Sequence, residues 1–117
     1  MWNMGQYFKA VNVSKKEYVD PWDVGGLAKL WEWCANREAS IFPYLLRKSN
    51  EHGGGDTDNP DAQYAGRWAG DEVYLIGDYD ESKLYQKAKQ EFTNISKPLA
   101  EEYNEFMQVR ELQLKAA

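Results

Sequence analysis

Apolar and polar residues along the first twenty positions follow the pattern of a β-hairpin. Residues 6–13 are rich in β-forming side chains, and Glu17-Tyr18-Val19 follows after a short polar stretch. Apolar residues fall on both faces of the first segment, which is typical of a central strand. A third strand is predicted at 72–76, where a continuous apolar run is bounded on both sides by Gly-Asp pairs.

The first of four predicted helices follows the glycine pair at 25–26. Its apolar residues recur at i, i+3, i+4 and i+7, which places them on one stripe of a helix. The members of this stripe are Leu27, Leu30, Trp31 and Cys34. We expect the stripe to lie in the core, together with Leu75 and Ile76 of the third strand. Trp33 lies off the stripe, so it is either at the edge of the core or an exposed aromatic anchor.

Three further helices complete the pattern. One begins after Ser40, a favoured N-cap residue, and continues to about Lys48, with Pro43 in its first turn, where a missing N–H costs little. The other two are predicted over residues 84–95 and from Ser96 onward. The sequence therefore predicts one α+β domain over the whole chain. It has a small three-stranded sheet, a hairpin plus one later strand, covered on one face by about four helices.

Composition and charge exclude several classes of protein. Five Trp and eight Tyr supply enough apolar area for a core, despite a mean hydropathy of −0.77. The net charge of −5 argues against a general nucleic-acid binder, which needs a basic surface. No apolar run approaches the ~20 residues that cross a bilayer, and the first residues lack the basic and apolar regions of a signal peptide. We expect a cytoplasmic protein that makes no membrane contact.

Metal and cysteine chemistry find little support. Cys34 and His52 are the only residues of their kind, too few for an internal disulfide or a zinc site. A Cys–His catalytic pair is disfavoured because Cys34 lies on the predicted apolar stripe. The segment Asp56-x-Asp58-x-x-Asp61 carries three carboxylates, as hard-cation sites do, but Pro60 breaks the EF-hand pattern. We therefore predict a solvated loop, no bound metal and no cofactor.

The segment 65–71 gives the most specific functional signal. Arg67 and Trp68 lie between two glycines. The guanidinium offers a planar set of donors to a carboxylate or phosphate, and the indole offers a stacking face. The alternative is structural: Arg67 forms an ion pair with Asp71 or Asp78, and Trp68 lies in the core.

Two other features extend this candidate site. The glycine run at 53–55 can present backbone N–H groups to a phosphate, although no P-loop or dinucleotide pattern is present. Asp78 ends the third strand, and carboxylates at the carboxyl end of a strand often border a site. The predicted ligand-binding residues are Gly53, Gly54, Gly55, Asp56, Arg67, Trp68, Asp71 and Asp78.

Several separated blocks of the sequence are shared with one family of proteins. They are Met4-Gly5-Gln6-Tyr7-Phe8-Lys9, Val11-Asn12, Lys15-Lys16-Glu17-Tyr18, Leu30-Trp31-Glu32, Gly53-Gly54-Gly55-Asp56, Gly66-Arg67-Trp68-Ala69-Gly70-Asp71 and Gly77-Asp78-Tyr79. Over roughly residues 4 to 80 the chain resembles a family of small hypothetical proteins of bacteria, archaea, phages and fungi. The resemblance implies that Met4 is the usual start. It implies no mechanism, cofactor or catalytic residue, because no activity is attached to the family.

Three functions remain, in order of preference. The first is a non-enzymatic binding module for a small anionic or nucleotide-like ligand held by Arg67, Trp68 and the glycine run. The second is an acidic protein-interaction module, such as an inhibitor or anti-defence factor of a mobile element. The third is an enzyme that uses Asp56, Asp71 or Asp78 as acid, base or metal ligand.

Overall fold

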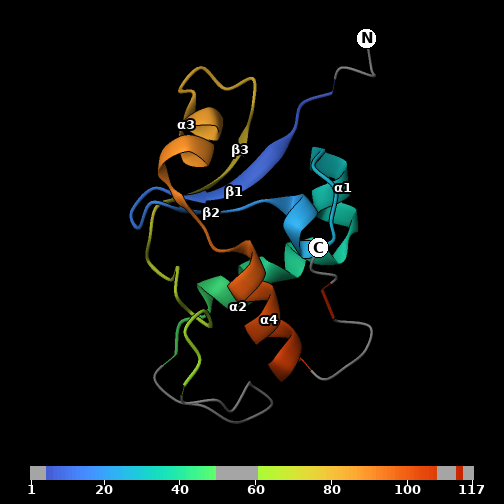
Figure 1. Ribbon diagram of the computed structural model, residues 1–117, viewed down its shortest axis with the longest axis vertical. Helices are drawn as coiled ribbons and strands as arrows, with labels where there is room; N and C mark the ends of the chain where they lie inside the picture. The colour runs from blue at the N-terminus through green and yellow to red at the C-terminus, as the bar shows by residue number, and fades with distance from the viewer. Residues whose placement is uncertain (1–4, 50–60, 108–112, 115–117) are drawn as a thin grey trace.

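A computed structural model describes residues 5–49, 61–107 and 113–114, and confirms the α+β class (Figure 1). The strands are β1 (Phe8–Asn12), β2 (Glu17–Val19), β3 (Val73–Gly77) and β4 (Thr93–Asn94), in the sheet order β3-β1-β2-β4. The helices are α1 (Leu30–Ala35), α2 (Ile41–Leu46), α3 (Leu84–Glu91) and α4 (Ser96–Phe106). Two short 3-10 helices, η2 (Pro21–Val24) and η3 (Arg37–Ser40), precede α1 and α2 respectively.

The predicted hairpin and third strand are confirmed. β1 and β2 pair antiparallel, with Asn12 opposite Glu17, and β3 pairs antiparallel along the other side of β1, with Phe8 opposite Gly77. β1 is therefore a central strand. This position explains why the sequence carries apolar residues on both of its faces.

The prediction of three strands is wrong by one. β4 pairs parallel with β2, so the sheet is four-stranded and mixed. The N–H of Thr93 donates to the carbonyl of Lys16 at 2.9 Å, and the N–H of Ile95 donates to the carbonyl of Tyr18 at 3.0 Å. Two exposed residues between two helices carry no strand periodicity. Their pairing exists only because the chain between α3 and α4 passes beside β2.

Helices cover both faces of the sheet, not one. Strand side chains alternate between faces, and α3 lies on one side of the sheet while α2 and α4 lie on the other (Figure 1). Val11 and Ile76 pack in a smaller cluster with Ala88 of α3. Ala10 and Val19 belong to the larger cluster on the opposite face. The domain thus has two apolar layers separated by one sheet.

The predicted core face of α1 is wrong. Its four stripe residues are exposed, with Trp31 at 66% and Leu30 at 52%. Trp33 instead is 2% exposed, its indole N–H donates to the carbonyl of Phe8 at 3.1 Å, and its ring lies 5.8 Å from that of Phe42. A helix of six residues with apolar side chains on several sides has no unique apolar face. The contact with β1 decided which tryptophan is buried.

The remaining expectations for the core are partly met. Ile76 is 9% exposed, and Leu75 is only half-buried because β3 is an edge strand. The second helix begins at Ile41 as predicted, but the hydroxyl of Ser40 donates to the carbonyl of Arg37 and does not cap the helix. Within the described residues, no helix is long and apolar enough to cross a membrane.

Candidate functional site

Arg67 and Trp68 close over one end of the β1–β2 hairpin, where both bind the carboxylate of Glu17. Arg67 donates through Nε at 3.0 and 3.1 Å and through Nη2 at 2.5 Å, and the indole N–H of Trp68 donates at 2.9 Å. Trp68 is fully buried. Gly66 makes this approach feasible: its φ is +75°, and a Cβ there would lie 2.7 Å from the carbonyl oxygen of Arg47.

Glu17 is a buried carboxylate that stays ionised. Burial by itself raises the pKa of a carboxyl group, but here the hydrogen bonds from Arg67 and Trp68 outweigh burial, so the pKa of Glu17 lies below its usual value. The hydrogen bonds from Arg67 to Glu17 in turn raise the pKa of Arg67. Because the guanidinium already has a bidentate carboxylate partner, an external anion would have to compete with Glu17.

Asp71 belongs to a second network at the same end of the hairpin. It accepts hydrogen bonds from Lys15 Nζ at 2.6 Å and Asn12 Nδ2 at 2.8 Å. The bond from Lys15, followed by that from Asn12, lowers the pKa of Asp71. Asn12 and Glu17 face each other in the hairpin. The structure thus brings Arg67, Trp68 and Asp71 together around this paired position.

Of the other predicted ligand-binding residues, the structure describes only Asp78, which does not join this group. Asp78 follows the opposite end of β3, where its carboxylate accepts the N–H of Tyr7 at 3.0 Å. Gly53, Gly54, Gly55 and Asp56 lie outside the described residues, as do His52 and Asp58. The contacts of Arg67 fit the structural interpretation, an ion pair within the protein, more closely than the ligand-binding one. Its ion-pair partner is Glu17, not Asp71 or Asp78.

A second set of anion-binding donors is also satisfied within the chain. Glu102 of α4 accepts the backbone N–H groups of Gln63, Tyr64 and Ala65 at 2.6, 2.9 and 3.2 Å. It also accepts the hydroxyl of Tyr44 at 2.7 Å. Consecutive N–H groups of this kind form a concave anion site. Here, as at Arg67, an internal carboxylate occupies it.

Lys9 is a buried cation that the sequence did not single out. It is 3% exposed, and its ammonium lies 3.8 Å from the ring centre of Tyr85 and 5.4 Å from that of Tyr18. Burial lowers the pKa of Lys9, whereas the nearby charge of Asp20 opposes this effect. The ammonium also donates to the carbonyl of Tyr85 at 3.4 Å. These contacts account for the position of Lys9 as a cation–π anchor between the sheet and α3.

Glu38 is a second buried acid that sequence reasoning did not single out. It is 1% exposed, and one of its oxygens accepts the N–H of Leu27 at 2.9 Å. The other oxygen, Oε2, has no hydrogen-bond partner among the described residues. Gly26 packs directly against the carboxyl group, since a Cβ there would lie 2.1 Å from Glu38 Cδ. The only sequence signal is this glycine, because Asn36-Arg37-Glu38 has the composition of a solvated turn.

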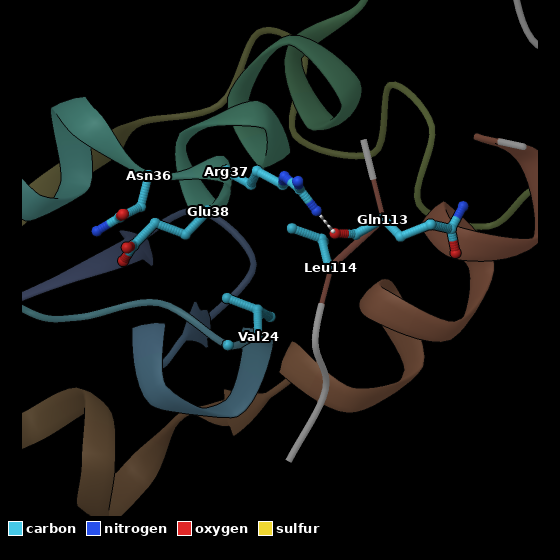
Figure 2. A pocket seen from close by; sticks show the side chains of 7 residues that line it. Val24, Asn36, Arg37, Glu38, Gln113 and Leu114 are labelled. Atoms are coloured by element: carbon cyan, nitrogen blue, oxygen red, sulfur yellow. Dashed lines mark hydrogen bonds between the residues drawn. The ribbon is translucent and has the colours of Figure 1, made fainter. Parts of the chain in front are cut away.

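Glu38 borders a cavity of about 200 Å³ between η2, η3 and the segment at 113–114 (Figure 2). Arg37 points away from its carboxyl group and donates to the carbonyl of Gln113 at 3.2 Å. Burial raises the pKa of Glu38 to about 7, although the N–H of Leu27 and the side chain of Asn36 favour the charged form. Such a pKa suits proton transfer. The carboxyl group, however, is enclosed by the protein and lies in contact with Gly26.

We expect Glu38→Gln to stabilise the protein at neutral and alkaline pH. The folded protein holds this proton more tightly than the unfolded chain, so the wild type loses stability as the pH rises from about 4.5 through about 7. Removing the ionisable group should recover up to about 3 kcal/mol above pH 7 and almost nothing at pH 4. Denaturant unfolding of both proteins between pH 4 and 8.5 measures this difference. A difference that does not change with pH would contradict the raised pKa.

An open apolar cleft is the other feature that the sequence did not predict. We call it the Trp31 cleft; it has a volume of about 430 Å³ and is lined by Gly5, Gln6, Phe8, Lys29, Leu30 and Trp31. It lies where the chain enters β1 and where α1 begins. The N–H of Phe8 donates to the carbonyl of Ala28 at 2.8 Å and joins the two segments. Leu30 and Trp31, which the sequence pattern placed in the core, therefore line a cleft at the surface.

No protein-family model, curated protein or solved structure matches the chain. The family resemblance inferred from the sequence blocks stays a prediction. Among the described residues, no group of three or more His, Cys, Asp or Glu side chains is arranged to hold a metal ion.

Proposed function

We propose that this protein is a protein-interaction module whose contact surface is the Trp31 cleft. The observation that carries the proposal is the exposure of Trp31, at 66%, beside Leu30, at 52%. Large apolar side chains that gather around a hollow are typical of protein-binding surfaces. Tryptophan is also among the residues that most often dominate binding energy.

Contacts within the protein anchor the helix that carries Trp31. Trp33, on the other side of α1, is buried and donates to the carbonyl of Phe8. The N–H of Lys29 donates to the carboxylate of Glu32 at 3.0 Å and closes the first turn of the helix. A preformed surface loses less conformational entropy on association. Trp31 is thus presented by a helix whose opposite side is anchored in the core.

Lys29 indicates the chemistry of the partner. Its side chain runs along Gly5, with Cε 3.2 Å from the position of a Gly5 Cβ, so the ammonium lies at the rim of an apolar hollow. We expect the partner to insert an apolar side chain with a carboxylate next to it. The other two functions suggested by the sequence are less well supported. Arg67 is bound to Glu17, and among the described residues only the enclosed Glu38 has a carboxyl group whose pKa is raised to about 7.

A peptide-display selection tests this proposal. Random twelve-residue peptides are selected on the wild-type protein and their affinities are then measured against Trp31→Ala and Trp22→Ala. Trp22 is the matched control, since it is 46% exposed and packs against Tyr7 outside the cleft lining. We expect acidic, apolar peptides that lose at least about tenfold in affinity for Trp31→Ala and keep it for Trp22→Ala. Peptides that bind all three proteins equally, or no enrichment, would refute the proposal.

A further inference from the structure

β3 is an edge strand that carries none of three common edge protections, namely a charged side chain, a proline or a bulge. It ends the sheet beside β1, and its five residues, Val73-Tyr74-Leu75-Ile76-Gly77, include no charge and no proline. The pairing with β1 advances residue by residue, so no bulge interrupts it. Natural proteins commonly block an edge with one of these devices, because an open edge pairs with other strands.

The register shows which backbone groups of β3 point outward. Val13 N–H donates to the carbonyl of Glu72, and Asp78 N–H donates to the carbonyl of Tyr7, both at 2.9 Å. Hydrogen-bonded and non-bonded pairs alternate in an antiparallel ladder. The backbone N–H and carbonyl groups of Tyr74 and Ile76 therefore point toward β1. The backbone N–H and carbonyl groups of Val73 and Leu75 point away from it.

These outward groups are unpaired within the part of the chain that the structure describes. The backbone N–H and carbonyl groups of Val73 and Leu75 have no hydrogen bond to another described segment. Tyr74, between them, is 46% exposed. An added strand would find two donors and two acceptors in line, with an aromatic side chain beside them.

We propose that β3 accepts an extended, basic segment of another protein as a fifth strand. The side chains that flank β3 are acidic: Glu72 directly precedes it and Asp78 directly follows it. Asp80 and Glu81 are exposed further along the chain. A strand of β-forming residues with lysine or arginine at both ends would match this pattern.

The same charges disfavour two arrangements in which β3 would pair with a second copy. An antiparallel two-fold pairing centred on Leu75 places Glu72 of one chain opposite Asp78 of the other at both ends. A parallel in-register pairing sets each acid beside itself. Like charges directly opposite each other destabilise a strand pair.

The probe is a peptide of five alternating valines and threonines with two lysines at each end. It is added to isotopically labelled protein and followed by amide NMR and hydrogen exchange. We expect the amides of Val73 and Leu75 to shift, and to exchange at least about tenfold more slowly at saturation. A peptide with glutamates in place of the lysines should produce neither effect.

Val73→Pro and Val73→Ala form the matched pair of variants. Proline at the first residue of an edge strand removes the outward N–H and leaves the ladder to β1 intact, while alanine removes similar packing and keeps the N–H. Binding should weaken about tenfold in Val73→Pro relative to Val73→Ala, provided that both melt cooperatively. If Val73→Pro does not fold, a basic peptide N-methylated on its alternate amides replaces it and should not bind.

Three results would overturn the proposal: no shift at Val73 and Leu75, equal binding of the acidic peptide, or a wild-type dimer that Val73→Pro dissociates. Trp31→Ala should leave binding of the basic peptide unchanged. The test of strand pairing at β3 can therefore fail or succeed independently of the test of partner binding at the Trp31 cleft.

Discussion

Trp33→Ala should lower the free energy of unfolding by about 3–5 kcal/mol, the usual cost of removing a large aromatic side chain from a core. The variant leaves a cavity next to Phe42 and removes the donor to the carbonyl of Phe8. Trp31→Ala, two residues away, should change stability by no more than about 0.5 kcal/mol, because that side chain is mostly in solvent. Denaturant unfolding of the two variants measures both values.

The comparison of the two tryptophans is sharp because both lie on the same six-residue helix, α1. Their effects on helix propensity are the same, so any difference reports on the burial of Trp33 and its hydrogen bond to Phe8. Equal losses in the two variants would show that the orientation of α1 is wrong. The Trp31 cleft, which depends on that orientation, would then lose its basis.

Arg67→Ala should lower the free energy of unfolding by about 3–5 kcal/mol at neutral pH, because it leaves the buried carboxylate of Glu17 with the indole of Trp68 as its remaining side-chain donor. In the wild type, the lowered pKa of Glu17 means that this contribution is present above about pH 4.5. It is lost as the pH falls through the folded-state value. The deficit of the variant should therefore shrink in acid. Unfolding measured at pH 3.5 and pH 7 tests both parts.

A double-mutant cycle separates the Glu17–Arg67 pair from the rest of the network. Adding Glu17→Gln to Arg67→Ala should recover part of the loss, since the uncompensated charge is gone. Arg67→Lys should remain unstable because an ammonium cannot reproduce the bidentate geometry. Lys15→Ala serves as a control, since it removes a nearby cation from the exposed bond to Asp71.

The stability of Arg67→Ala also decides whether Arg67 is a structural anchor or a residue that binds an external anion. If Arg67→Ala is as stable as the wild type, Arg67 is not a structural anchor. A nucleotide or inorganic phosphate that raises the melting temperature of the wild type, but not of Arg67→Ala, would then favour the anion-binding function. We expect no such shift, because Glu17 already occupies the guanidinium.

Features that depend on short-range patterns were predictable from the sequence. The hairpin, the β3 run and the helices of the C-terminal third were found because alternation and three-to-four spacing report local backbone geometry. The prediction for α3 was too long, since the helix ends at Glu91 and β4 occupies part of the span predicted to be helical. The glycines at 66 and 70 were also informative. Both have positive φ, and the turn that they shape brings Arg67 and Trp68 onto the hairpin.

Long-range partners were not predictable in the same way. The sequence indicated an ion pair for Arg67, but the predicted partners, Asp71 and Asp78, are close to it in the chain. The observed partner, Glu17, lies fifty positions away. Glu38 was hidden in a polar triplet, and β4 has no pattern at all. In each case the missing information is which segments meet in space.

By itself, the sequence determined the α+β class, the main strands and helices, and the presence of an arginine and a tryptophan in a constrained turn. Only the tertiary structure decided which tryptophan of α1 is buried, which carboxylate binds Arg67, and which strands lie at the edges of the sheet. The physical reason is that periodicity specifies a face only when an element is long enough for its apolar residues to single out one side. α1 has six residues, so its orientation was set by a hydrogen bond and packing against β1.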